Sequence, residues 1–302
     1  MKGIILAGGN ATRLYPATVC LNKHLLPVYN KPMIYYPLSV LMLAGIRDIL
    51  LISSPRDIES FRSIFGSGER WGLRLSYAVQ PRPNGLAEAL IIGADFINGQ
   101  EVCLALGDNI FFGHGLPALL KDTVRSMKKR GGAYVFASGV KDPERYGIVA
   151  FDSSGVAVSV EEKPKKPKSN WAVTGLYFFD KDCARIARSV KPSARGELEI
   201  TSVNAVYLKK GVLHVNPIGR GFAWFDAGTH DSFLEASKFI ATIETRTGFM
   251  VGCIEEVACN NGWITRKALL TMGKALGKTE YGQYLIRAAQ GENAPHSPRT
   301  GG

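Results

Sequence analysis

Residues 2–32, KGIILAGGNATRLYPATVCLNKHLLPVYNKP, decide which kind of fold this chain adopts. The stretch opens with a short apolar run of the kind that forms a fully buried parallel strand. Gly8 and Gly9 follow almost at once, and glycine lets the chain turn sharply and brings bare backbone N–H groups close to a ligand. Arg13 and Lys23 then place two cations within reach of the same turn. Backbone amides, a planar guanidinium and an ammonium together predict a polyphosphate site.

Two common phosphate-binding motifs are absent from this stretch. There is no G-x-x-x-x-G-K-[ST], which excludes a Walker-type P-loop, and no G-x-G-x-x-G, which excludes the dinucleotide fingerprint. A glycine pair alone also occurs in ordinary strand-to-helix turns. Arg13, Lys23 and Pro27 are what favour a functional loop here.

Strand-like and helix-like segments alternate through the first half of the chain. Such alternation is typical of βαβ crossovers and predicts an α/β three-layer sandwich, with a mostly parallel, Rossmann-like sheet and helices on both faces. Ligands of such sheets bind beyond the carboxyl ends of the strands, which places Gly8, Gln80 and Asp108 at one edge. Strands are expected at residues 3–6, 48–53, 73–80, 101–106 and 133–138, and helices at 33–46, 56–65, 86–96 and 115–129.

The second half of the chain changes character. Residues 147–164, GIVAFDSSGVAVSVEEKP, predict two strands joined as a hairpin. Residues 288–302 are rich in proline, glycine and polar residues and predict a disordered tail. Between them we expect a strand at 175–179, a helix at 181–190, a turn between 213–217 and 221–224, a long helix at 230–244 and two short helical patterns at 251–285.

Composition limits the classes of protein. The chain has 302 residues, of which 46% are hydrophobic, and contains no apolar run long enough to span a membrane and no signal-peptide pattern. Five cysteines, odd in number and without a C-x-x-C spacing, favour free thiols in a cytoplasmic protein. The net charge of +11 is spread along the chain without an aromatic-basic recognition motif, which favours a solvated basic surface and small anionic substrates over nucleic acid.

Polar residues that follow buried strands are the candidates for chemistry. Asp108, in ALGDNIFFG, would be costly to bury without a partner and suits a Mg²⁺ ligand, although a turn or helix cap is the alternative. Asp226, in AWFDAGT, is the natural second carboxylate. The amide of Gln80 can donate and accept, as contact with a pyrimidine edge requires, but a polar loop residue is the alternative. The histidines lack metal-ligand spacing, so no zinc site is expected, and no nucleophile–base motif is evident.

The motifs LAGG-x-x-TRLYP-x-T and NK-x-LLPVYNKPMIYYPL resemble the signature of the sugar-1-phosphate nucleotidylyltransferases, and the resemblance extends to about residue 285. It implies transfer of a nucleotidyl group from dTTP to α-D-glucose 1-phosphate with release of pyrophosphate, for deoxysugar and polysaccharide biosynthesis. Mg²⁺ as cofactor and a cytoplasmic homotetramer are also implied. The implied organisation is a core at 1–245, with a nucleotide-binding part at about 1–140 and a sugar-binding part at about 141–245, then a helical segment for subunit contacts at 246–287 and the tail at 288–302.

The resemblance also assigns residues to roles. Arg13, Lys23 and Lys163 would be catalytic, and Asp108 and Asp226 would hold the metal. The nucleotide would contact Leu6, Gly8, Gly9, Ala11, Thr12, Arg13, Lys23, Gln80, Gly85 and Asp108. The sugar phosphate would contact Asn109, Tyr146, Gly147, Glu162, Lys163, Val173, Arg195 and Trp224. Taken singly, Tyr146, Trp224 and Arg195 fit core packing or a surface ion pair equally well.

The chain departs from the family's pattern near the phosphates. Ala11 stands where the family usually has glycine, and a Cβ there costs on the order of 1 kcal/mol if the position needs a positive φ. Asn22-Lys23-His24 stands where long-form members usually read Ser-Lys-Gln, and Ala227 where the family usually has Thr. We expect a working enzyme with a slightly different loop.

The expected chemistry is direct attack of the sugar phosphate, already an anion, on the α-phosphorus without a general base. Arg13 and the glycine turn would hold the β- and γ-phosphates, Lys23 the α-phosphate, and Lys163 the nucleophile. Two alternatives stay open. One is the same fold with UTP or another sugar phosphate, because one methyl group discriminates by only about 1–3 kcal/mol. The other is a sugar-nucleotide sensor with poor turnover.

Overall fold

The computed structural model describes residues 1–9 and 11–291. Its strands are β1 (Lys2–Ala7), β2 (Pro27–Val28), β3 (Lys31–Pro32), β4 (Asp48–Ser53), β5 (Arg74–Val79), β6 (Val102–Leu106), β7 (Asn109–Gly113), β8 (Ala133–Gly139), β9 (Gly147–Phe151), β10 (Ala157–Glu162), β11 (Trp171–Phe179), β12 (Leu213–Ile218) and β13 (Phe222–Asp226). Its α-helices are α1 (Tyr35–Leu43), α2 (Ile58–Phe65), α3 (Glu88–Ile92), α4 (Ala94–Ile97), α5 (Leu116–Arg130), α6 (Cys183–Ser189), α7 (Ile200–Lys209), α8 (His230–Thr247), α9 (Ile254–Asn260), α10 (Arg266–Ala275) and α11 (Glu280–Gln290). Short 3-10 turns are η1 (Thr12–Leu14), η2 (Lys23–Leu25), η3 (Glu69–Trp71) and η4 (Pro143–Arg145).

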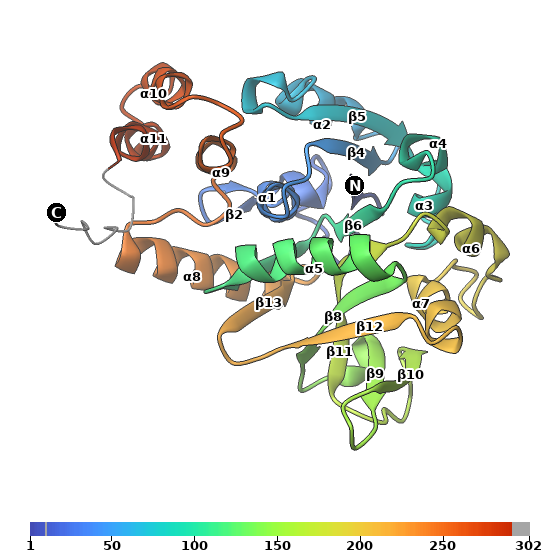
Figure 1. Ribbon diagram of the computed structural model, residues 1–302. Coiled ribbons are helices and arrows are strands. Elements are labelled where there is room, and N and C mark those ends of the chain that lie inside the picture. The colour runs from blue at the N-terminus through green and yellow to red at the C-terminus, as the bar shows by residue number, and fades with distance from the viewer. Residues whose placement is uncertain (10, 292–302) are drawn as a thin grey trace, which may run out of the picture.

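A nine-stranded sheet with helices on both faces forms the centre of the molecule (Figure 1). In one half of this sheet, β6, β1, β4 and β5 are neighbours and all parallel. Side chains alternate between the faces: Ile5 of β1 packs with α1, α2 and α5, whereas Ile4 packs with α3, α6 and α7. The predicted three-layer α/β fold is confirmed.

The other half of the sheet is antiparallel around β11, which pairs with β6, β8 and β9. The expected hairpin is present as β9 and β10. The expected turn between 213–217 and 221–224 does not join a hairpin: β12 pairs with β8 in the main sheet, whereas β13 pairs with β7 in a separate two-stranded sheet. This second pairing places the end of β13 beside the start of β7.

Some elements differ from the sequence predictions. The helix expected at 86–96 is two helices separated at Gly93, where a Cβ would lie 2.6 Å from Ile4 Cδ1 of the sheet below. α7 was not predicted, although Ile200, Val203 and Tyr207, all buried, have helical spacing. β7 was also missed, because it is short and its partner lies more than a hundred residues downstream.

Up to residue 291, three helices, not two, follow the core, and α9, α10 and α11 lie together at one end of the molecule, away from the β9–β10 hairpin (Figure 1). α8 continues to Thr247, past the expected core boundary at 245, and α11 to Gln290, so the expected tail is wrong for residues 288–290 and otherwise lies outside the described residues. Within the described residues, no helix is long and apolar enough to cross a membrane.

Candidate active site

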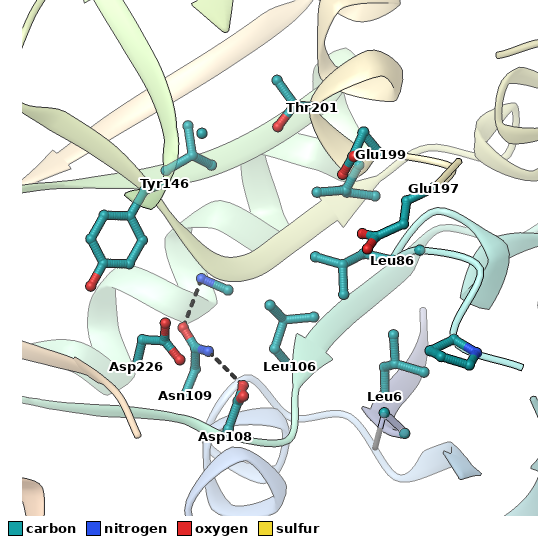
Figure 2. Close-up of a pocket in the computed structure, with 18 of the residues that line it drawn as sticks. Leu6, Leu86, Leu106, Asp108, Asn109, Tyr146, Glu197, Glu199, Thr201 and Asp226 are labelled. Carbon is teal, nitrogen blue, oxygen red and sulfur yellow. Dashed lines mark hydrogen bonds between the residues drawn. The ribbon is translucent and has the colours of Figure 1, made fainter. Parts of the chain in front are cut away.

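A cavity of about 550 Å³ opens where β1, β5 and β6 end. It is lined by nearly all the residues that the sequence assigned to substrates or metal; Ala11 and Thr12 do not line it. Figure 2 shows Leu6 and Leu86 at one end, Tyr146 and Asp226 toward the other, and Asp108 and Asn109 between them. The cavity therefore has one end with apolar side chains and one end with polar side chains, as two different substrates require.

Two carboxylates and a lysine meet in the middle of the cavity. Lys23 donates a hydrogen bond to Asp108. Burial opposes ionisation of Asp108, but the charge of Lys23 and the hydrogen bonds from Lys23 and Asn109 outweigh it, so the pKa of Asp108 is lowered. Burial and the negative charge of Asp108 raise the pKa of Asp226 from 3.8 to about 6. Asp226 is therefore the carboxylate whose charge the protein compensates less, and a divalent cation held by these carboxylates would compensate it.

Asn109 fixes the orientation of Asp108. Its Nδ2 donates to Asp108 Oδ1 at 3.0 Å, and its Oδ1 accepts from Gly175 N at 3.0 Å and from Trp224 Nε1 at 2.6 Å. A Cβ on Gly175 would lie 2.5 Å from Asn109 Oδ1, so the close approach of β11 requires glycine there. Asn109 and Trp224 both line the cavity, but the Asn109 amide and the Trp224 indole already form hydrogen bonds within the protein.

A second buried network lies beneath Lys23. Asn22 Nδ2 donates to Asp57 Oδ2 at 2.8 Å, and Asn22 Oδ1 accepts from the backbone N and from Nδ1 of His24 at 2.9 and 2.7 Å. Burial, together with Lys23, lowers the pKa of His24 to about 3, so the ring is neutral and donates from Nδ1. The departure Asn22-Lys23-His24 is thus one hydrogen-bonded unit, because each of the two altered residues is the other's partner.

Two non-glycine residues, one in a loop next to the cavity-lining Arg13 and one in the cavity lining, have left-handed backbone conformations. Ala11 has φ 48°, which meets the condition under which its Cβ costs on the order of 1 kcal/mol. Its carbonyl oxygen accepts from Leu14 N and from Thr18 Oγ1, which holds the loop in this conformation. Lys163, at the end of the hairpin, has φ 42°. Strained backbone of this kind is concentrated at functional sites.

Acidic and aromatic side chains line the polar end of the cavity. The rings of Tyr146 and Trp224 meet edge to face, 5.3 Å between centroids. Glu162 accepts from Thr201 Oγ1 and lies 3.3 Å from Arg195 Nη2. Arg195 Nη2 also donates to Glu199 Oε1 at 2.8 Å, so the guanidinium predicted to hold the sugar phosphate is paired with carboxylates in this structure.

Several lining residues were missed by the sequence predictions. Arg145 lies directly before Tyr146 in DPERYG and forms an ion pair with Asp142; a cation beside a predicted site residue was the available signal. The others come from the loop before α7 and its first turn, and a prediction of that helix would have indicated them: Glu197, Glu199, Ile200 and Thr201. Pro83, Leu86, Leu106 and Tyr177 also line the cavity, and no local pattern marks them. His24, noted in the sequence as a departure from the family's pattern, lines it as well.

Comparison with known proteins agrees with this architecture. The family model described as nucleotidyl transferase matches residues 2–243. The chain belongs to the nucleotidyl transferase family, and it is therefore a nucleotidyltransferase.

Among its relatives, the glucose-1-phosphate thymidylyltransferase of Neisseria gonorrhoeae is 56% identical over 286 residues, which are 95% of this chain and 98% of that protein. The protein of the same name from Mycobacterium tuberculosis is 54% identical, with 95% and 98% covered.

Solved structures agree in fold. A crystal structure from Bacillus anthracis, of a protein provisionally named glucose-1-phosphate thymidylyltransferase and in complex with sucrose, has a TM-score of 0.73 at 42% identity, covering 79% of this chain and 94% of that one. A UDP-glucose pyrophosphorylase in complex with UDP-glucose has a TM-score of 0.71 at 24% identity, covering 80% and 98%. This second likeness extends to the fold alone.

Proposed function

We propose that this enzyme transfers the thymidylyl group of dTTP to α-D-glucose 1-phosphate, giving dTDP-glucose and pyrophosphate. The observation that carries the proposal is that the glycine turn, Lys23, the two carboxylates and Lys163 all line one cavity, in a chain more than half identical to proteins of that name. Its apolar end suits a base, and its polar end suits a hexose.

In this proposal, charge neutralisation and positioning supply the catalysis. Arg13 and the N–H groups of Gly8 and Gly9 hold the β- and γ-phosphates, and Lys23 moves from Asp108 to the α-phosphate. Lys163 binds the sugar phosphate and lessens repulsion between two anionic substrates. The attacking oxygen is already an anion, so no residue needs to take a proton from it.

Asp108 and Asp226 are the residues that would hold Mg²⁺. The raised pKa of Asp226, which burial and the charge of Asp108 cause, supports this proposal, because a divalent cation would supply positive charge there. No group of three or more potential ligands occurs among residues 1–9 and 11–291, and Mg²⁺ is commonly bound by one or two carboxylates plus substrate phosphates. When bound, it would neutralise charge that develops on the phosphates.

The test is pyrophosphate release with Mg²⁺ and glucose 1-phosphate, comparing dTTP, UTP, CTP, ATP and GTP. We expect release to be strongest with dTTP and to be abolished in Asp108→Asn. Strongest release with UTP would replace dTTP in the proposal. Binding of dTDP-glucose without release from any nucleotide would favour the sugar-nucleotide sensor. The proposal also includes a cytoplasmic homotetramer, which gel filtration with light scattering and cell fractionation would test.

A further inference from the structure

The amide nitrogen of Gln80 is fully used within the protein. Gln80 Nε2 donates to Glu88 Oε2 at 2.7 Å and to Gly85 O at 3.2 Å. An amide nitrogen carries two hydrogens, so these two contacts leave no hydrogen for a ligand. Gln80 lines the cavity although the residue is only 5% exposed. Only the carbonyl oxygen of the Gln80 side chain remains available for a hydrogen bond with a ligand.

That oxygen faces the glycine turn at the apolar end of the cavity. A Cβ on Gly8 would lie 2.9 Å from Gln80 Oε1, and both residues line the cavity. Leu6 and Leu86 lie at the same end (Figure 2). A flat ring that enters between these side chains therefore meets a hydrogen-bond acceptor flanked by Leu6 and Leu86, where an unsatisfied polar contact is costly.

Glu88 is the residue that sets this orientation. If the Gln80 amide turned over, its Oε1 would face Glu88 Oε2 and Gly85 O, which are both acceptors, and two hydrogen bonds would be lost. Glu88 is itself held, because its Oε1 accepts from Asn84 Nδ2 at 2.9 Å. A carboxylate imposes the orientation, whereas an amide at position 88 could pair with either face of Gln80.

We propose that Glu88 is a specificity-determining residue that acts through Gln80: it holds the amide with its acceptor toward the nucleobase, and so selects bases that present a ring N–H. Thymine and uracil carry a hydrogen on N3, whereas N3 of cytosine is itself an acceptor. With N3 opposite Gln80 Oε1, cytosine gives two facing lone pairs and no hydrogen bond, and its 4-amino group can donate to that oxygen only after the base has shifted from this position. The inference rests on the proposed function, in which a pyrimidine nucleotide occupies this end of the cavity.

The test compares binding of dUTP and dCTP, which share sugar and phosphates and lack the thymine methyl group. Calorimetric titration with Mg²⁺ present and sugar phosphate absent is expected to give a dissociation constant at least 10-fold lower for dUTP. In the nearly isosteric Glu88→Gln, the ratio of the dCTP dissociation constant to the dUTP dissociation constant should fall about 10-fold, because the amide of Gln80 can turn over. Glu88→Ala should lower this ratio as well. Asn84→Ala, which removes a partner of Glu88 but not its contact with Gln80, is the matched control and keeps the ratio.

If the role of Glu88 is merely structural, its substitution weakens binding of dUTP and dCTP equally and leaves the ratio of their dissociation constants unchanged. That result would overturn the inference. So would a parent protein that binds dCTP as tightly as dUTP, or that binds neither. Thermal unfolding of each variant shows that it is folded. Binding is measured without turnover, so the two proposals can fail separately. Absence of pyrophosphate release from dTTP would overturn the proposed function. A preference for dUTP that is lost in Glu88→Gln would still support the role of Glu88.

Discussion

Asp226 gives the most direct physical test of the site, because its charge should destabilise the ligand-free protein. Its pKa is raised from 3.8 to about 6 by burial and by Asp108. The folded protein therefore holds this proton more tightly than the unfolded chain does. The stabilisation that the proton provides is complete below about pH 3.8 and is lost as the pH rises through about 6.

The magnitude follows from the shift. Each pKa unit corresponds to about 1.4 kcal/mol, so at pH 7.5 the ionised carboxylate should cost about 3 kcal/mol of unfolding free energy. Asn has nearly the shape of the protonated acid and stays neutral. We therefore expect Asp226→Asn to be more stable than the parent by about 3 kcal/mol at pH 7.5, and by about 1 kcal/mol or less at pH 4.5. The same variant should lose pyrophosphate release.

The assay is urea unfolding in EDTA at both pH values, with equal m-values as the check that only stability changed. Asp122→Asn, which removes an exposed carboxylate of α5, is the charge-matched control and should give no comparable gain. Mg²⁺ with dTTP should then stabilise the parent much more than Asp226→Asn. A variant no more stable than the parent at pH 7.5, or equally stabilised at both pH values, would refute the electrostatic account of the carboxylate pair.

Substitutions at three further positions test the loops. Ala11→Gly relieves left-handed strain of about 1 kcal/mol but loosens the unfolded chain by a similar amount, so we expect a change in melting temperature of no more than about 2 °C; Ala11→Val, with its β-branch at φ 48°, should lower kcat/KM for dTTP at least 10-fold, and equal kinetics of the two would contradict the strain. Asn22→Ala removes a donor from buried Asp57 and the acceptor of His24; chemical denaturation should show a loss of about 1–3 kcal/mol, and a neutral result would mean that water replaces the amide. Lys163→Gly and Lys163→Met both remove the ammonium group and should raise KM for glucose 1-phosphate at least 10-fold. The glycine variant should be about 1 kcal/mol more stable than the methionine variant, because glycine has no strain at φ 42°. An unchanged KM would show that Lys163 does not bind the sugar phosphate.

The sequence by itself determined the fold class and most of the cavity. Alternating apolar strands and amphipathic helices dictate a layered α/β fold because each sheet face must be covered. In a parallel sheet the residues that follow each strand meet at one edge, which is why Gly8, Gln80 and Asp108 could be placed together from sequence order alone. Those residues all line the observed cavity.

Only the tertiary structure decided which atoms of those residues remain available to a ligand. Asp108 pairs with Lys23, the amide of Asn109 is used by Gly175 and Trp224, and Gln80 keeps only its oxygen because Glu88 takes its nitrogen. Most of these contacts join segments far apart in the chain, and all of them depend on side-chain orientation. Local periodicity carries no information about either, so the hydrogen-bond partners that set charge and specificity emerge only when the chain has folded.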